Sequence, residues 1–331
     1  MTPKSDRSVS GRLTRREFLA RSSALVAGAT AASVGRAMAG DGPPGALTGP
    51  QATVVRVRSD HVVVARQVHG VVLAEMLEKG LMLTTGAPNA VEAWRSLLQK
   101  DDVIGLKFNG SGAEALGTTV PMARALIESL TAAGFANDHI VPIEVPPAVY
   151  DEFQTARPMA GWDRDETAFD SGSDQLALVL RQVTAIVNVP FLKDHNIAGL
   201  TCCLKNLSHA LVKHPARFHG NHCTPYISDI VALPQIRDKL RLHVVNALRL
   251  VYAGGPEAPE TSTAGAGLLF VGTDPVDIDT IAIDEINYHR NSHDMRVIEP
   301  EDGWLGYLQR GAERGLGCAN PHDIRVLKVR L

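Results

Sequence analysis

Histidine and cysteine gather in one short stretch of this chain. Five of the twelve histidines fall between positions 195 and 222, and three of the four cysteines lie in or beside that window. These residues are His195, His209, His214, His219, His222, Cys202, Cys203 and Cys223. Imidazole and thiolate are the usual protein ligands of zinc, copper and iron.

The stretch therefore allows a transition-metal ion as cofactor. The candidate ligands are His209, His219, His222 and Cys223. Pro215 and Gly220 indicate a bend that could gather the later histidines. Their spacing matches no specific metal motif, and a solvated loop or an anion-binding surface would have the same composition. The metal interpretation and these non-metal interpretations all stay open.

A second group of residues is basic or carries a side-chain amide, and most of its members follow predicted strands. It consists of Lys107, Asn109, Lys193, His195, Lys205 and Asn206. Such lysines can bind a carboxylate or phosphate, or donate a proton to a developing anion. Any one of them can instead extend into solvent from the sheet edge or pair with an acidic neighbour. In the catalytic interpretation the lysines bind an anionic group, and His195, with an unperturbed pKa of about 6.5, is the acid/base.

Two further motifs follow later strands. Asp274 begins the run Asp-Pro-Val-Asp-Ile-Asp, where a helix is expected to start. A carboxylate there stabilises the helix dipole, which is a sufficient account of Asp274, although the run could also bind a divalent cation. Gly254 and Gly255 precede Pro256 in a turn that can adopt left-handed backbone angles and approach a ligand closely. No nucleotide-binding glycine loop and no Gly-x-Ser-x-Gly elbow occurs in the sequence.

Short apolar runs that alternate with helical periodicity must position these side chains. The predicted strands are 52–57, 62–66, 103–108, 139–145, 185–189, 242–248, 268–271 and 324–329. The predicted helices are 71–79, 90–99, 120–133, 201–211, 227–239, 276–288 and 304–314. Thr119 and Asp274 are the expected caps of two of them. This order predicts an α/β fold with a mostly parallel, doubly wound sheet, helices on both faces, and ligands beyond the carboxyl ends of the strands. Residues 161–174 form either a boundary between two lobes or one long surface loop.

The ordered motifs resemble the domain of unknown function 362 (DUF362) family. They are Gly105–Asn109, Asn188–His195, Gly199–Leu207, Gly254–Pro256 and Asp274–Asp279. The resemblance runs from about residue 62 to 288 and implies a site made of Lys107, Lys193, His195, Lys205 and Asp274. Members of the family often accompany or contain ferredoxin-like iron-sulfur modules, which implies redox metabolism by association. This chain lacks the cysteine-rich ferredoxin part.

The amino-terminal segment is similar to a twin-arginine export signal. Arg15 and Arg16 precede Phe18 and Leu19, and a mildly apolar stretch ends in an Ala-Met-Ala cleavage box at residues 37–39. We therefore expect a signal peptide over 1–39, a flexible lead-in over 40–50 and an α/β domain over 51–331. The twin-arginine translocation machinery is then a partner, and the folded mature chain is periplasmic or extracellular with no stable membrane anchor.

The mature chain is acidic. Residues 1–39 hold seven Lys/Arg and two Asp/Glu, so their removal takes the formal net charge from −3 to −8. A charge of this sign disfavours a nucleic-acid partner. The four cysteines are too few for a disulfide scaffold, although a bridge from the 202/203 pair to Cys223 is open in an oxidising compartment.

The functional hypothesis from the sequence is an exported enzyme, with redox chemistry favoured, that acts on a small anionic molecule. Two alternatives stay open. One is a periplasmic protein that binds a metal or metabolite without catalysis. The other is a hydrolase or lyase that uses His195 and the lysines.

Overall fold

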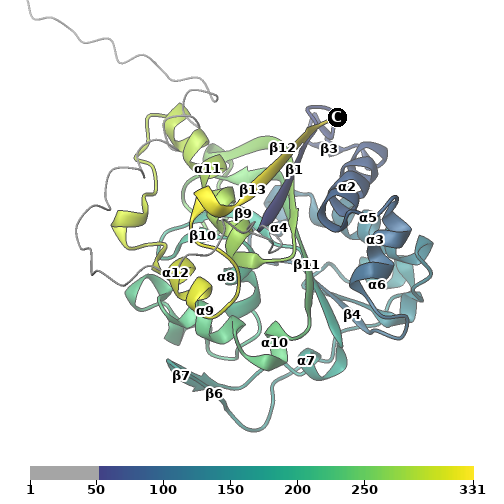
Figure 1. Ribbon diagram of the computed structural model, residues 1–331, viewed down its shortest axis with the longest axis horizontal. Coiled ribbons are helices and arrows are strands. Elements are labelled where there is room, and N and C mark those ends of the chain that lie inside the picture. Colours follow the sequence, from purple (N-terminus) through teal and green to yellow (C-terminus); the bar gives the residue numbers. More distant parts are fainter. Residues whose placement is uncertain (1–51) are drawn as a thin grey trace, which may run out of the picture.

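A nine-stranded sheet forms the centre of the computed structural model (Figure 1). The structure describes residues 52–331, so the predicted signal peptide and lead-in lie outside the described residues. The strands of the sheet are β1 (Thr53–Arg58), β4 (Ile104–Lys107), β5 (Ile140–Ile143), β8 (Ala185–Asn188), β9 (Phe191–His195), β10 (Gly199–Thr201), β11 (Leu240–Val251), β12 (Thr263–Gly272) and β13 (Arg325–Arg330). Two small hairpins join β2 (Val63–Val64) to β3 (Gln67–Val68) and β6 (Thr167–Phe169) to β7 (Gly172–Asp174).

The sheet is mostly parallel. Its order is β13-β1-β12-β11-β8-β4-β5, with β9 beside β11 and β10 beside β9. Strand β12 runs antiparallel between β1 and β11, and β10 runs antiparallel to β9. The pairs β4/β5, β4/β8, β8/β11, β9/β11 and β1/β13 are parallel. The predicted α/β class is therefore confirmed.

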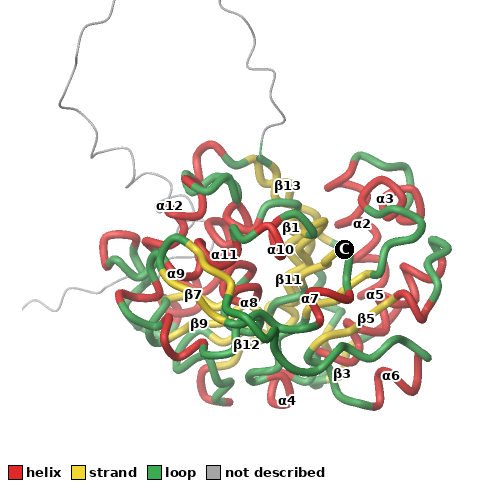
Figure 2. Tube along the Cα trace, turned by 90° about the horizontal axis from the view of Figure 1, so that it is seen from below, coloured by secondary structure: helices red, strands yellow, loops and turns green. Residues whose placement is uncertain are grey.

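Helices cover both faces of the sheet (Figure 2). One face carries α2 (Gly70–Thr85), α3 (Ala90–Leu97), α5 (Thr119–Ala132) and α6 (Ala148–Phe153). The other carries α7 (Val179–Gln182), α8 (Cys203–Ser208), α9 (Tyr226–Val231), α10 (Pro234–Arg237), α11 (Pro275–Ser292) and α12 (Gly306–Glu313). The short α4 (Ala113–Leu116) precedes α5. None of the helices in residues 52–331 is both long and apolar enough to cross a membrane.

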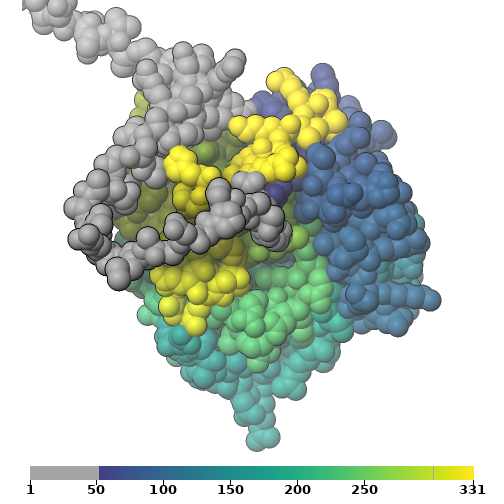
Figure 3. Space-filling view, viewed as in Figure 1, coloured from purple at the N-terminus to yellow at the C-terminus, as the bar shows by residue number. Residues whose placement is uncertain are grey.

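Two hydrophobic cores separate the sheet from the two helical layers. Successive strand residues point to opposite faces, so Val244 enters the core beneath α2 and α5, while Val245 enters the core beneath α8 and α11. Burying each such side chain contributes about 1.5–3 kcal/mol. The β6–β7 hairpin lies in the lower part of the molecule in Figure 1, within the teal region along the lower edge of the surface in Figure 3. It contains most of the 161–174 segment.

Several predicted elements differ from the observed ones. The segment after β8 forms strands β9 and β10, which were not predicted, and the predicted strand 62–66 is only the two-residue β2. Pro234 starts a separate helix, so the predicted helix 227–239 is divided into α9 and α10. The residue before α5 is Thr118 rather than Thr119, and its hydroxyl donates to Asn246 Oδ1 at 3.2 Å instead of capping the helix.

The order of the strands reverses between β4 and β8. From β4 the chain moves to β5 on one side, and from β5 it returns to β8 on the other side of β4. In open α/β sheets the crevice at such a reversal, beyond the carboxyl ends of the strands, is where ligands bind. Lys107 ends β4 and Asn188 ends β8, so both lie at this point.

Candidate functional site

A chain of hydrogen-bonded side chains joins the ends of β4 and β8 to β9 and α8. Asn206 Oδ1 accepts hydrogen bonds from Lys107 Nζ at 3.2 Å and Asn109 Nδ2 at 3.1 Å. Asn109 Oδ1 in turn accepts from Lys193 Nζ at 3.0 Å. The structure thus brings together four residues of the predicted site, from the end of β4, from β9 and from α8. We call them, with Asn188, the amide network.

The orientation of each amide in the network is fixed by its neighbours. Asn188 Nδ2 donates to the carbonyl of Cys203 at 3.0 Å and lies 3.0 Å from His243 Nδ1, which leaves Asn188 Oδ1 as an acceptor. Asn206 Nδ2 donates to that oxygen at 2.7 Å and to the carbonyl of Lys107 at 3.1 Å. A flip of either amide would place like groups opposite each other, so the network defines a single arrangement.

Lys107 is fully enclosed and uses all three N–H groups of its ammonium. They donate to Glu144 Oε2 at 3.1 Å, to Asn206 Oδ1 at 3.2 Å and to the carbonyl of Phe108. Burial lowers the pKa of Lys107, and the carboxylate of Glu144 partly opposes that shift. An ammonium has three donors, so Lys107 has none left for a ligand.

Lys193 is committed in the same way. Its Nζ donates to Asn109 Oδ1 at 3.0 Å, to the carbonyl of Ser111 at 2.6 Å and to the carbonyl of Pro256 at 2.7 Å. Burial lowers its pKa to about 8. The geometry therefore gives both lysines a positioning role, because they hold two strand ends and two loops together. The sequence hypothesis had assigned both of them to anion binding.

The Gly-Gly-Pro turn lies against β9 and supports Lys193. Gly255 N donates to Asp194 Oδ2 at 3.2 Å, and Arg290 donates to Asp194 Oδ1 at 3.0 Å from helix α11. The next residue, Pro256, supplies one of the Lys193 acceptors. Gly254 and Gly255, expected to contact a ligand, thus contact the protein's own strand. Gly254 has a φ of 74°, which favours glycine.

Replacing Gly255 by alanine is expected to destabilise the protein by about 3 kcal/mol or more. A Cβ at this position would lie 1.8 Å from the carbonyl oxygen of Asp194, a backbone atom that cannot move without displacing β9. Gly265→Ala is the matched control, since a Cβ there meets nothing within 4 Å. Urea unfolding of both variants measures the difference. Equal stabilities would show that the turn does not pack against β9 as described.

His195 is held as a neutral donor. Its Nδ1 accepts hydrogen bonds from the backbone N–H groups of Ile197 and Ala198, both at 3.1 Å. The ring proton must therefore sit on Nε2. Burial, together with the nearby charge of Lys205, lowers the pKa of His195 to about 3. The ring is thus uncharged near neutral pH, and the expected acid/base with an unshifted pKa is not what its surroundings favour.

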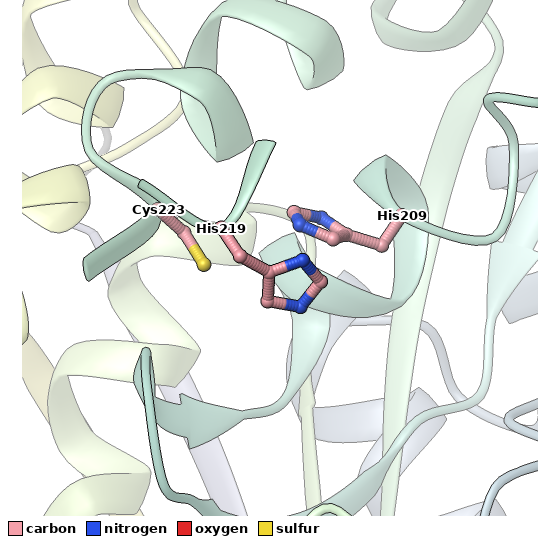
Figure 4. A group of neighbouring side chains, drawn as sticks. All are labelled: His209, His219 and Cys223. Carbon is pink, nitrogen blue, oxygen red and sulfur yellow. The ribbon is translucent and has the colours of Figure 1, made fainter. Parts of the chain in front are cut away.

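Two histidines and a cysteine converge beside His195, and we call them the His-His-Cys cluster. His209, His219 and Cys223 each offer a ligand atom within 4.8 Å of the others. Figure 4 shows the thiol and the two imidazoles turned toward one another. The rings of His209 and His219 meet edge to face, with centroids 4.6 Å apart. Of the predicted ligand set, the structure brings these three together.

The tautomers in the cluster suit metal binding. His219 Nδ1 lies 3.1 Å from the carbonyl of Pro215, to which it donates, so that Nε2 carries the lone pair. Lys205 Nζ lies 3.2 Å from that nitrogen and would have to move aside for a metal ion. A metal-bound histidine usually donates its other ring N–H to a backbone carbonyl, a carboxylate or a water molecule. His209 Nε2 is buried and has no hydrogen-bond partner in the described chain, while His209 Nδ1 lies 2.8 Å from the hydroxyl of Ser208. An unsatisfied buried nitrogen is costly and calls for a partner.

His222 points away from the cluster. Its Nδ1 lies 3.0 Å from the carbonyl of Ile197, and its ring faces Trp304. Asn221, His222 and Cys223 form the turn η4 (Asn221–Cys223) with φ values of 48°, 52° and 65°. Three successive left-handed residues without glycine are strained. This turn directs Cys223 inward and His222 outward, which the sequence could not indicate.

Lys205, which belongs to α8, lies beside the His-His-Cys cluster. Its Nζ lies 3.2 Å from His219 Nε2, and the side chain is 6% exposed. Burial lowers its pKa to about 8. No carboxylate within residues 52–331 forms an ion pair with it, whereas Lys107 has Glu144. Lys205 is therefore a buried cation whose other two N–H groups have no partner in the described chain.

The acidic motif lies apart from the lysines. Asp274 precedes α11 and accepts a hydrogen bond from Thr273 Oγ1 at 2.8 Å, while Asp277 accepts from the N–H of Cys318 at 2.6 Å. Asp279 is fully buried and accepts from the N–H groups of Cys203 and Leu204 at 2.7 and 3.0 Å. It thus satisfies the first turn of α8, and burial raises its pKa to about 6. Burial and the nearby charge of Asp274 raise the pKa of Asp277 to about 6, whereas Asp279 turns toward α8, so the three carboxylates do not form one cation site.

All four cysteines are free. Cys202 and Cys203 lie with Asp279 in one buried group, and Cys223 lies with the histidines in another. Burial raises the pKa of Cys202 to about 12. The bridge to Cys223 that the sequence left open is absent from the structure.

Glu144 is a residue of this site that the sequence did not single out. It follows β5 with a φ of 60° and accepts from Lys107 Nζ and from the N–H of Gly110 at 2.8 Å. The predicted strand extended to residue 145, which hid Glu144 as a strand-end residue. It also lines an open cavity of about 560 Å³ with Gly110 and Thr119. None of the residues of the His-His-Cys cluster lines that cavity.

One family model matches part of the chain. Residues 147–284 match the model described as "Domain of unknown function (DUF362)". The match supports the resemblance seen in the motifs, and it contains Lys193, His195, Lys205 and the His-His-Cys cluster. Lys107 and Asn109 precede it. No curated protein matches the chain.

Proposed function

We propose that the protein is an exported, metal-associated enzyme of the redox class that acts on a small anionic molecule. The observation that carries the proposal is the His-His-Cys cluster with its unpartnered nitrogen. His209 follows the last residue of α8, and His219 and Cys223 converge on it from the loop beyond. Two imidazoles and a thiolate are the trigonal ligand set of copper electron-transfer sites, and they also suit zinc.

The charge of the site supports an anionic substrate. A divalent ion bound by two neutral imidazoles and one thiolate keeps a net positive charge, and the ammonium of Lys205 lies 3.2 Å from one of the ligand nitrogens. Two uncompensated positive charges in a buried site are unfavourable. An anionic substrate or ligand would offset them, and it could occupy the position that three protein ligands leave open.

Export in the folded state is consistent with a metal loaded before translocation. The twin-arginine signal over residues 1–39 supports this part of the proposal, and the translocation machinery is the partner that it implies. In the cell the proposal predicts retention of the precursor when the two arginines are changed.

Elemental analysis tests the metal. Mature protein without a His-tag, purified after expression with a functional export system, is expected to contain about one transition-metal ion per chain. A content near zero would contradict the proposal. Copper or iron would favour the redox class. Zinc would favour the hydrolase or lyase instead, because its bound water is a nucleophile at neutral pH.

A further inference from the structure

We propose that Lys205 and His195 together bind the anionic group of the substrate, a carboxylate or another small oxyanion. The inference rests on the proposed function and deepens it, because it assigns the anion to one lysine out of three. It is independent of the metal in one respect. Both donors are present whether or not an ion occupies the His-His-Cys cluster.

The three lysines differ in how many N–H groups of the ammonium are free to bind a ligand. The N–H groups of Lys107 and Lys193 are all committed to protein oxygens. A ligand could reach either ammonium only by breaking the network that holds the strand ends. Lys205 has one bond, to His219 Nε2, and two N–H groups remain. It is the buried ammonium of the three that can donate to a ligand at no loss to the fold.

His195 supplies the second donor. The two backbone N–H groups that point at its Nδ1 require a proton on Nε2, and Nε2 has no hydrogen-bond partner in the described chain. The ring stacks on that of His219 with centroids 5.7 Å apart. His219 also contacts Lys205 through Nε2, so the ammonium of Lys205 and the ring of His195 both lie against the ring of His219.

The two donors have the properties of an oxyanion-binding site. One donor is charged and one is neutral, and both are fixed by protein contacts before a ligand arrives. Charge-assisted hydrogen bonds of this kind are stronger than neutral ones, more so in a site shielded from water. A carboxylate that bridges the two donors would also compensate the unpaired charge of Lys205.

Binding of oxalate and of phosphate to the chelator-treated, metal-free protein tests the proposal by calorimetry. We expect one oxyanion per chain, with an affinity that falls as salt rises. Lys205→Met keeps most of the length of the side chain and removes its charge, and it is expected to weaken binding about 100-fold. Lys213→Met is the matched control, because Lys213 is exposed and bonds to Gln175. Its affinity should equal that of the wild type.

His195→Asn isolates the second donor. The amide oxygen of asparagine can replace Nδ1 as the acceptor for Ile197 and Ala198, whereas no group replaces the N–H at Nε2. Binding should weaken about tenfold with an unchanged melting temperature. Unaltered binding by Lys205→Met, or no binding of either anion by the wild type, would overturn the inference. A metal-free wild type that binds the anion through Lys205 would support it even if elemental analysis contradicts the proposed metal.

Discussion

Replacing His219 by alanine is expected to reduce the metal content of the purified protein from about one ion per chain to nearly none. The substitution removes one of three protein ligands, so we expect metal affinity to fall at least about 100-fold, since even outer contacts to ligands contribute 10–100-fold. Elemental analysis after dialysis against a weak chelator measures the loss. The fold should persist, because His219 is partly exposed and its contacts in the described chain are with Pro215, Lys205 and two neighbouring rings.

His222→Ala is the matched control for this experiment. His222 is three residues further along the same loop, and its Nδ1 lies beside a backbone carbonyl outside the cluster. The His222→Ala variant should therefore keep its metal. Loss of metal from both variants would indicate that the loop, rather than the ligand, had been disturbed. Retention of metal by His219→Ala would place the ion elsewhere and contradict the proposed site.

Strands with regular apolar patterns could be predicted from the sequence, and strands rich in polar residues could not. Each of the strands β1, β4, β5, β8, β11, β12 and β13 overlaps a predicted strand. β9 carries Lys193, Asp194 and His195, and all five of its residues are buried. Local hydrophobicity cannot identify such a strand, since its polar groups are satisfied by distant residues such as Asn109 and Arg290.

The position of the site in the fold could be predicted from the sequence better than the role of each residue in it. Reasoning from parallel strand ends grouped Lys107, Asn109, Lys193 and Asn206, and these side chains are hydrogen-bonded neighbours in the structure. Which lysine has free donors depends on partners far away in the chain, such as Glu144 and Pro256. The protonation of His195 likewise depends on a backbone turn and on burial. Neither is encoded in the spacing of residues.

Replacing Asn206 by leucine is expected to give the largest loss of stability among substitutions at the amide network. Four groups lose a partner: Lys107 Nζ, Asn109 Nδ2, Asn188 Oδ1 and the carbonyl of Lys107. Each buried polar group left unsatisfied costs about 1–3 kcal/mol. Leucine has the same branched shape but is larger and apolar, so it excludes water from these groups, and we expect a loss of about 4 kcal/mol or more in urea unfolding.

Asn206→Ala should be less damaging than Asn206→Leu, although alanine removes the whole amide group and leaves nothing in its place. The space that alanine leaves is lined by polar groups, and a water molecule there can restore some of the hydrogen bonds. Asn137→Leu is the control, because the partners of Asn137 lie near the surface, where water can replace the lost bonds for about 1 kcal/mol or less. If leucine at position 206 were tolerated as well as alanine, hydrogen bonding would not be what holds the strand ends together. The commitment of Lys107 and Lys193 to positioning would then be wrong, and both ammonium groups would again be candidates for binding the anion beside Lys205.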